Sequence, residues 1–181
     1  MGARDYIPHY TYDDYAQWEG DWELYEGVPV AMAPAPLISH QAIAYALANA
    51  LADAIGDCDQ CLVVGETDYR LADDTVVRPD VVLICGEPNE AYITKAPEIV
   101  IEVVSPSTRK RDEGYKYERY EAAGVKYYLL VDPETLKAEI FTLENGRYVK
   151  AGTFSTETYR FEHTLCDAAI DFDRVFRRFR K

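Results

Sequence analysis

Residues Pro97–Tyr120 read PEIVIEVVSPSTRKRDEGYKYERY, and this stretch decides the fold. Its first half is apolar and β-branched, which is typical of a buried β-strand, and a proline soon ends it. Ser107 or Thr108 can then cap a helix that runs to Gly124. Glu102 is out of place in such a strand, because a buried carboxylate is costly unless a partner compensates it.

The segments before this stretch predict a helix followed by strands. A long helix is expected to begin at Ser39 and to end at Gly56, since apolar residues recur every four positions between them. The stretches QCLVVGETDYRL and TVVRPDVVLI predict two strands that form a meander with PEIVIEVV. Near the N-terminus, TYDDYAQW predicts a short helix, and WELYEG with VPVAMAP predicts a hairpin around Gly27.

The segments after it predict a crossover and a second hairpin. VKYYLLVD is a fourth strand, joined to PEIVIEVV by the helix, and such a connection between parallel strands is right-handed. Asn145-Gly146 is a strong hairpin signal between AEIFTL and RYVKAGTF. The order helix, three strands, helix, strand, with a hairpin at each end, therefore predicts an α/β protein whose mixed sheet is covered by helices.

The length of 181 residues suits one domain. We divide it into an N-terminal helix and hairpin (1–36), a core (37–133), and a C-terminal hairpin with a basic tail (134–181). No apolar run approaches the ~18 residues that span a membrane. The opening MGARDYIPHY lacks the apolar region of a signal peptide. We therefore expect a cytoplasmic protein.

The charge is unevenly distributed. The net charge is −13, which argues against broad non-specific affinity for nucleic acid. Residues 1–100 carry 4 basic and 18 acidic side chains, whereas residues 101–181 carry 15 and 14. Basic residues cluster after the third strand and again in the tail RVFRRFRK. Taken alone, these clusters are better explained as a solvated helix face and a frayed basic end than as a ligand-binding site.

Four cysteines are too few and too irregularly spaced to predict a secreted disulfide framework. Cys58 and Cys61 form a C-x-x-C, a spacing that occurs in redox pairs and zinc sites. Because this motif lies between a helix and a strand, and no second C-x-x-C exists, we expect two thiols in a connection.

Two acidic residues occupy comparable positions in neighbouring strands. Asp80 opens the strand VVLI, and Glu102 lies on the face of its strand that also carries Val100 and Val104. Two carboxylates held close together repel each other unless a cation lies between them. Carboxylates favour the hard cations Mg²⁺ and Mn²⁺, so the pattern predicts a site for one of these metals.

Several segments in order resemble the Uma-type restriction endonuclease family, within the PD-(D/E)XK nuclease superfamily. They are RPDVVLI, APEIVIEVVSPST and RDEGYKYERYEAAGVKYYLLVDPE, extended by YEGVPVAMAP, SHQAIAYALANAL and the NGRY hairpin. The resemblance implies a restriction-endonuclease-like core and cleavage of DNA. It also implies that Asp80, Glu102 and the backbone carbonyl of Val103 bind Mg²⁺ or Mn²⁺. We further expect a homodimer.

The sequence departs from the superfamily pattern at one position. Val104 stands where the motif places a lysine, which in related nucleases orients water and neutralises charge on the phosphate. The resemblance implies that Lys116, in the next helix, replaces it. An ordinary ion pair of Lys116 with Asp112, four residues earlier, is the alternative.

Further candidates surround this predicted site. His40, at the start of the first long helix, would approach the metal by family analogy, or it would simply bond nearby backbone. Four basic residues are candidates for DNA binding: Arg109, Lys110, Arg111 and Arg119. Four acidic residues are candidates for a rim: Glu23, Glu26, Glu66 and Asp68.

Two functions of different classes follow from these patterns. The first is a metal-dependent endonuclease that hydrolyses DNA phosphodiester bonds with Asp80, Glu102, Lys116 and His40 as catalytic residues. The second is a nuclease-fold module that no longer cleaves and that binds DNA or protein. The Asp80–Glu102 pair favours the first, whereas Val104 and the net charge of −13 favour the second.

Overall fold

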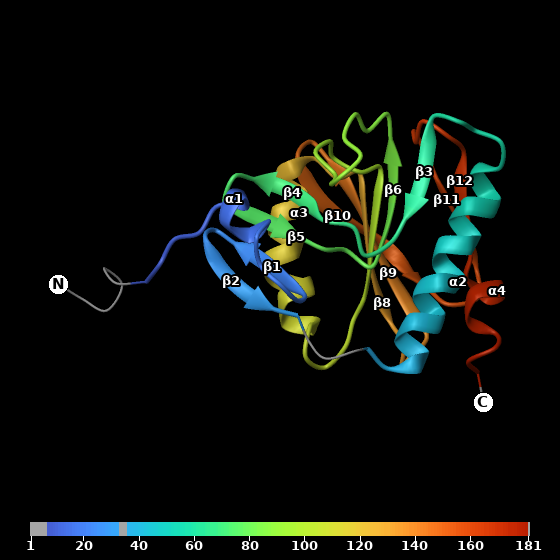
Figure 1. Ribbon diagram of the computed structural model, residues 1–181. Coiled ribbons are helices and arrows are strands. Elements are labelled where there is room, and N and C mark those ends of the chain that lie inside the picture. Colours follow the sequence, from blue (N-terminus) through green and yellow to red (C-terminus); the bar gives the residue numbers. More distant parts are fainter. Residues whose placement is uncertain (1–6, 33–35, 181) are drawn as a thin grey trace.

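The computed structural model describes residues 7–32 and 36–180. A large mixed sheet forms the centre of the molecule (Figure 1). Its six strands follow the spatial order β10-β9-β8-β7-β6-β3. Their bounds are β3 Cys61–Val64, β6 Val81–Cys85, β7 Ile99–Val103, β8 Tyr127–Asp132, β9 Lys137–Glu144 and β10 Arg147–Phe154.

The predicted core is confirmed. Strands β3, β6 and β7 form an antiparallel meander, and β8 pairs parallel with β7. The crossover between β7 and β8 consists of a π-helical segment, η2 (Arg111–Lys116), followed by α3 (Tyr117–Ala123). Helix α3 ends before Gly124, whose φ of 84° lies in the left-handed region that glycine tolerates. β9 and β10 form the hairpin predicted at Asn145-Gly146.

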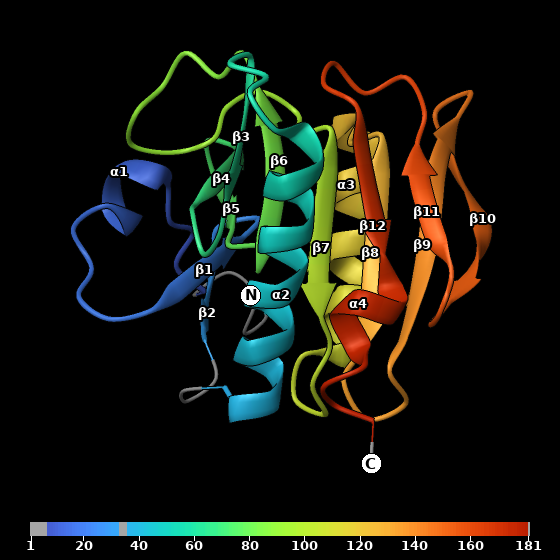
Figure 2. The same cartoon turned by 90° about the vertical axis from the view of Figure 1, so that its right-hand side faces the viewer.

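Helices and short strands cover both faces of the large sheet. Helix α2 (Ile38–Ile55) packs on one face together with the hairpin β11 (Thr158–Phe161) and β12 (Ala168–Asp171) and with α4 (Phe172–Phe176) (Figure 2). Helix α3 packs on the opposite face. Leu37 precedes α2, so Ser39 lies inside its first turn and does not cap it as predicted.

A second sheet of four strands lies beside the large one, with α3 between them (Figure 1). Its order is β2-β1-β5-β4, and the short helix α1 (Tyr12–Tyr15) packs against it. The strands are β1 Trp22–Tyr25, β2 Val28–Ala31, β4 Tyr69–Ala72 and β5 Thr75–Val77.

Two segments that were predicted as single strands divide between the sheets. QCLVVGETDYRL supplies β3 to the large sheet and β4 to the small one, and TVVRPDVVLI supplies β5 and β6. The chain crosses over near Gly65 and Pro79, where the proline has no N–H to continue a ladder. A Cβ on Gly65 would lie 2.9 Å from the carbonyl oxygen of Asp80, so this close crossing requires glycine.

All four cysteines form disulfides, which corrects the expectation of two thiols in a connection. Cys61 bonds to Cys85 at paired positions of β3 and β6, and Cys58 bonds to Cys166 ahead of β12. The C-x-x-C residues are therefore not bonded to each other, and among the described residues no cysteine is free. Spacing along the sequence does not reveal this pairing, because the partners lie 108 and 24 residues apart and come together only in the folded chain.

In the described part of the chain, no helix has both the length and the apolar character needed to cross a bilayer. The basic tail is described up to Arg180, and Lys181 lies outside the described residues. The tail leaves α4 at the end of the sheet where α2 begins (Figure 2).

The disulfide pairing is testable. Peptide mapping without reductant should recover Cys58 linked to Cys166 and Cys61 linked to Cys85. The double change Cys58→Ser, Cys166→Ser should lower the midpoint of thermal unfolding, because this link closes a loop of 108 residues; links of that length contribute up to about 4–5 kcal/mol. A peptide in which Cys58 is linked to Cys61 would contradict the structure.

Candidate active site

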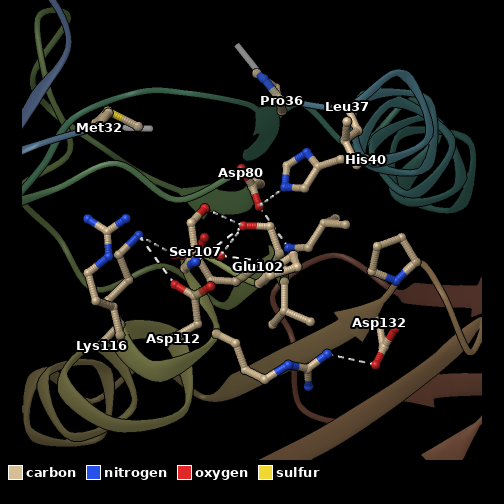
Figure 3. A pocket seen from close by; sticks show the side chains of 18 of the residues that line it. Met32, Pro36, Leu37, His40, Asp80, Glu102, Ser107, Asp112, Lys116 and Asp132 are labelled. Carbon is tan, nitrogen blue, oxygen red and sulfur yellow. Dashed lines mark hydrogen bonds and ion pairs between the residues drawn. The ribbon is translucent and has the colours of Figure 1, made fainter. Parts of the chain in front are cut away.

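A cavity of about 510 Å³ opens at the end of the large sheet where β7 and β8 finish (Figure 3). Much of its wall comes from the residues before α2 and in its first turn (36–40), the end of β7 and the loop after it (102–109), η2, and the end of β8 with the residues that follow (132–134). Asp80, Glu102, Lys116 and His40, all predicted as catalytic, line this cavity. Side chains far apart in the sequence therefore share one space.

Asp80 sits where β6 and β7 begin to diverge. Its Oδ2 accepts a hydrogen bond of 2.7 Å from the peptide N–H of Val103, which continues the pairing of the strands through a side chain. The same oxygen lies 3.5 Å from Nε2 of His40, as Figure 3 shows. Burial raises the pKa of Asp80 to about 6, although His40 and the Val103 N–H both oppose that rise.

Glu102 is enclosed within β7 and only 3% exposed. Its Oε1 accepts hydrogen bonds from Nζ of Lys116 at 3.0 Å and from the hydroxyl of Tyr120 at 2.8 Å. Burial raises the pKa of Glu102 well above its ordinary value. Lys116 opposes that rise, and the nearby carboxylates of Asp112 and Asp80 add to it. The direct partners of Glu102 are therefore a cation and a phenol.

Lys116 is the last residue of η2 and is almost completely buried. Its ammonium lies 2.9 Å from Oε1 of Glu23, 3.0 Å from Oε1 of Glu102 and 3.9 Å from Asp112. Burial would lower the pKa of Lys116, but these carboxylates hold it well above its usual value, so the side chain stays charged. The ion pair with Asp112 was the alternative reading of the sequence, and it is the longest of the three contacts.

The structure separates the predicted DNA-binding residues. Arg109 and Arg111 line the cavity, whereas Lys110 and Arg119 do not. Arg109 is paired with Glu113 and Asp132, and Arg119 is paired with Glu26 of the small sheet.

The predicted acidic rim is likewise divided. Glu23 and Glu66 line the cavity, and Glu66 accepts a hydrogen bond from Gln41. Asp68 does not line the cavity, but it is paired with Arg78, which does.

Sequence reasoning missed two partners of the buried charges. Tyr120, which donates to Glu102, was not singled out among 15 tyrosines. Glu23 was placed on a rim, but it is only 2% exposed and contacts Lys116 directly. An acidic residue within the short apolar strand WELY was the signal for Glu23, and it is the same signal that drew attention to Glu102.

The residues present fit a hard cation with few protein ligands. In the two described stretches, no group of three or more His, Cys, Asp and Glu side chains is arranged to hold a metal. Asp80 and Glu102 each keep one carboxylate oxygen that accepts no hydrogen bond from a described residue. Mg²⁺ commonly uses one or two carboxylates and completes its octahedron with waters.

The family model described as "Putative restriction endonuclease" (Uma2) matches residues 12–168. The chain belongs to this family. The resemblance read from the sequence is thereby confirmed. A search among curated proteins finds no match.

A solved structure shares the fold. It is described as a "putative nuclease belonging to DUF820" from Anabaena variabilis, and it superposes with a TM-score of 0.74 at 16% identity. The match covers 94% of this chain and 99% of the other. At that identity the similarity concerns the fold, and it confirms the predicted nuclease-like α/β architecture.

The raised pKa of Asp80 predicts how stability depends on pH in the metal-free protein. The folded state binds the Asp80 proton more tightly than the unfolded chain, whose pKa is 3.8. The stabilisation from this proton is complete below pH 3.8 and is lost as the pH rises through about 6.

Asp80→Asn keeps an acceptor for Val103 without the charge. It should be more stable than the parent at neutral pH, by up to about 3 kcal/mol, and equally stable at about pH 3, below both pKa values. Urea unfolding at both pH values in EDTA measures the difference. A variant that is less stable at neutral pH would identify the Asp80 carboxylate as a stabilising group.

Proposed function

We propose that this chain is a divalent-metal-dependent endonuclease that hydrolyses phosphodiester bonds in DNA. The supporting observation is the cavity that holds the carboxylates of Asp80 and Glu102, from adjacent strands, beside the fixed ammonium of Lys116. Phosphodiester hydrolysis needs anionic oxygens to bind a cation and a positive charge to stabilise the phosphate in the transition state. Family membership supports nuclease chemistry in general.

The metal would be Mg²⁺ or Mn²⁺. Asp80 and Glu102 would each bind it through the oxygen that accepts no hydrogen bond from a described residue, with the carbonyl of Val103 as a third ligand. A bound cation of this kind lowers the pKa of a coordinated water and polarises the phosphate. The buried surroundings strengthen these electrostatic interactions relative to those in bulk water.

The protein itself would supply positive charge and orientation. Lys116 keeps its charge because carboxylates surround it, so its ammonium can face developing charge on a phosphate oxygen. In the superfamily motif this role belongs to a lysine at the position that Val104 occupies here. Arg109 and Arg111, on the cavity wall, would hold neighbouring phosphates, and His40 would orient the Asp80 carboxylate through their 3.5 Å contact.

A nuclease-fold module that binds without cleaving is the second candidate. Two observations favour it: the ammonium of Lys116 is already paired with Glu23 and Glu102, and the net charge of −13 opposes DNA binding.

The homodimer and the cytoplasmic location stay predictions.

A metal titration tests the proposal. The parent should bind Mn²⁺ in calorimetry and should cut DNA in its presence, and the double change Asp80→Ala, Glu102→Ala should abolish both. Glu98→Ala is the matched control, because Glu98 pairs with Lys126 at the opposite end of β7 and should leave both intact. Equal Mn²⁺ binding by the parent and the double variant would exclude this site. Mn²⁺ binding without cleavage would favour the second candidate.

Lys116→Ala tests how much the Lys116 ammonium contributes to cleavage. Cleavage should fall about 10²-fold or more, because a charge-stabilising donor is lost from the transition state. Mn²⁺ binding should survive, since the three proposed ligands are unchanged, and circular dichroism will verify that the variant folds. Cleavage at the parent rate would leave Lys116 with a structural role only.

A further inference from the structure

Lys116 is shared by two carboxylates that come from different sheets. Glu23 belongs to β1 of the small sheet and Glu102 to β7 of the large one, and their Oε1 atoms lie 2.9 and 3.0 Å from the same Nζ. All three side chains are buried, with residue exposures between 2% and 5%. Bulk water therefore solvates these three charges poorly, and each charge is stabilised mainly by the other two.

The two carboxylates are held differently. Both oxygens of Glu23 have partners: Oε1 accepts a hydrogen bond from the peptide N–H of Arg78 at 2.8 Å and forms an ion pair with Nζ of Lys116 at 2.9 Å, and Oε2 accepts a hydrogen bond from the hydroxyl of Tyr25 at 2.6 Å. In Glu102, Oε1 accepts both available donors. Its Oε2 accepts none from the described residues. Glu23 is thus fully engaged with the protein, whereas Glu102 keeps one oxygen for a ligand.

We propose that Glu23 is a positioning residue that holds the Lys116 ammonium beside the cavity while Glu102 binds the divalent cation. The inference rests on the proposed function, and it assigns part of the catalytic machinery to the small sheet. A cation bound to Glu102 weakens the attraction between the Glu102 carboxylate and the Lys116 ammonium, and it also repels the ammonium directly. Glu23 supplies an anion that the cation does not share, so Lys116 can stay charged and in place.

Without Glu23, the ammonium would depend on Glu102. Its remaining carboxylate neighbour, Asp112, is 3.9 Å away, beyond hydrogen-bonding distance. Lys116 and the metal would then compete for one carboxylate. Mn²⁺ affinity should consequently depend on Glu23 only when Lys116 is present.

A double-mutant cycle tests this dependence. Glu23→Gln should weaken Mn²⁺ binding about tenfold or more, the usual effect of removing a residue that supports a metal ligand. In a Lys116→Met background the same change should alter Mn²⁺ affinity by less than about twofold, because no ammonium remains to compete. Isothermal titration calorimetry measures all four affinities and does not require cleavage.

The matched control is Glu139→Gln. Glu139 pairs with Lys150 on the surface of the β9–β10 hairpin, so the change removes an exposed Glu–Lys pair that does not line the cavity. It should leave Mn²⁺ affinity at the parent value. Glu23→Asp keeps the charge on a shorter side chain, and its Mn²⁺ affinity should lie between those of the parent and Glu23→Gln. It also serves as the test variant if Glu23→Gln does not fold.

Cleavage gives a second readout. Glu23→Gln should lower kcat about tenfold with little change in KM, and it should cause no further loss in the Lys116→Met background.

The possible outcomes separate the hypotheses. Parent-like Mn²⁺ affinity in Glu23→Gln, or equal losses in both backgrounds, would overturn the positioning role and leave the proposed function intact. A parent protein that binds no Mn²⁺ would overturn both.

Discussion

The buried ammonium of Lys116 between Glu23 and Glu102 is the interaction on which the arrangement of the site depends. Removing one partner from such a buried group typically costs about 3–5 kcal/mol, because a charge is left without compensation. Strand β1 of the small sheet, η2 of the crossover and β7 of the large sheet must therefore meet at this point. The aromatic stacks of Tyr25 on Tyr115 and of Tyr69 on Tyr120 pack the same junction with apolar surface.

The cavity follows from the way the strands end. β6 and β7 are paired up to Val81 and Ile101, and beyond that pair the side chain of Asp80 takes the place of a backbone acceptor. At Gly65 the backbone passes so close to Asp80 that a Cβ would lie 2.9 Å from the Asp80 carbonyl oxygen. A backbone crossing, a strand end and the first turn of α2 thus place polar groups together at the edge of an apolar sheet.

Local patterns in the sequence predicted much of this architecture. β-branched runs, the Asn145-Gly146 turn and the helical periodicity before Gly56 gave the core order correctly, and the anomalous Glu102 drew attention to the site. The division of strands between two sheets was missed, because alternation identifies a strand but not its neighbours. The roles of Glu23 and Tyr120 and the disulfide pairing depend on long-range contacts, which local periodicity does not encode.

The position of β3 at the edge of the large sheet has a consequence for self-association. One side of this strand has no sheet partner among the described residues, and Leu62 in the same strand is 63% exposed. Unpaired edges act as templates for intermolecular β-pairing, and short strands limit this tendency. The link from Cys61 to Cys85 also holds β3 beside β6. If β3 detached, the run VVLIC of β6 would become the edge of the sheet, with a much stronger tendency to form intermolecular β-pairs. This disulfide therefore helps to protect the folded protein against aggregation.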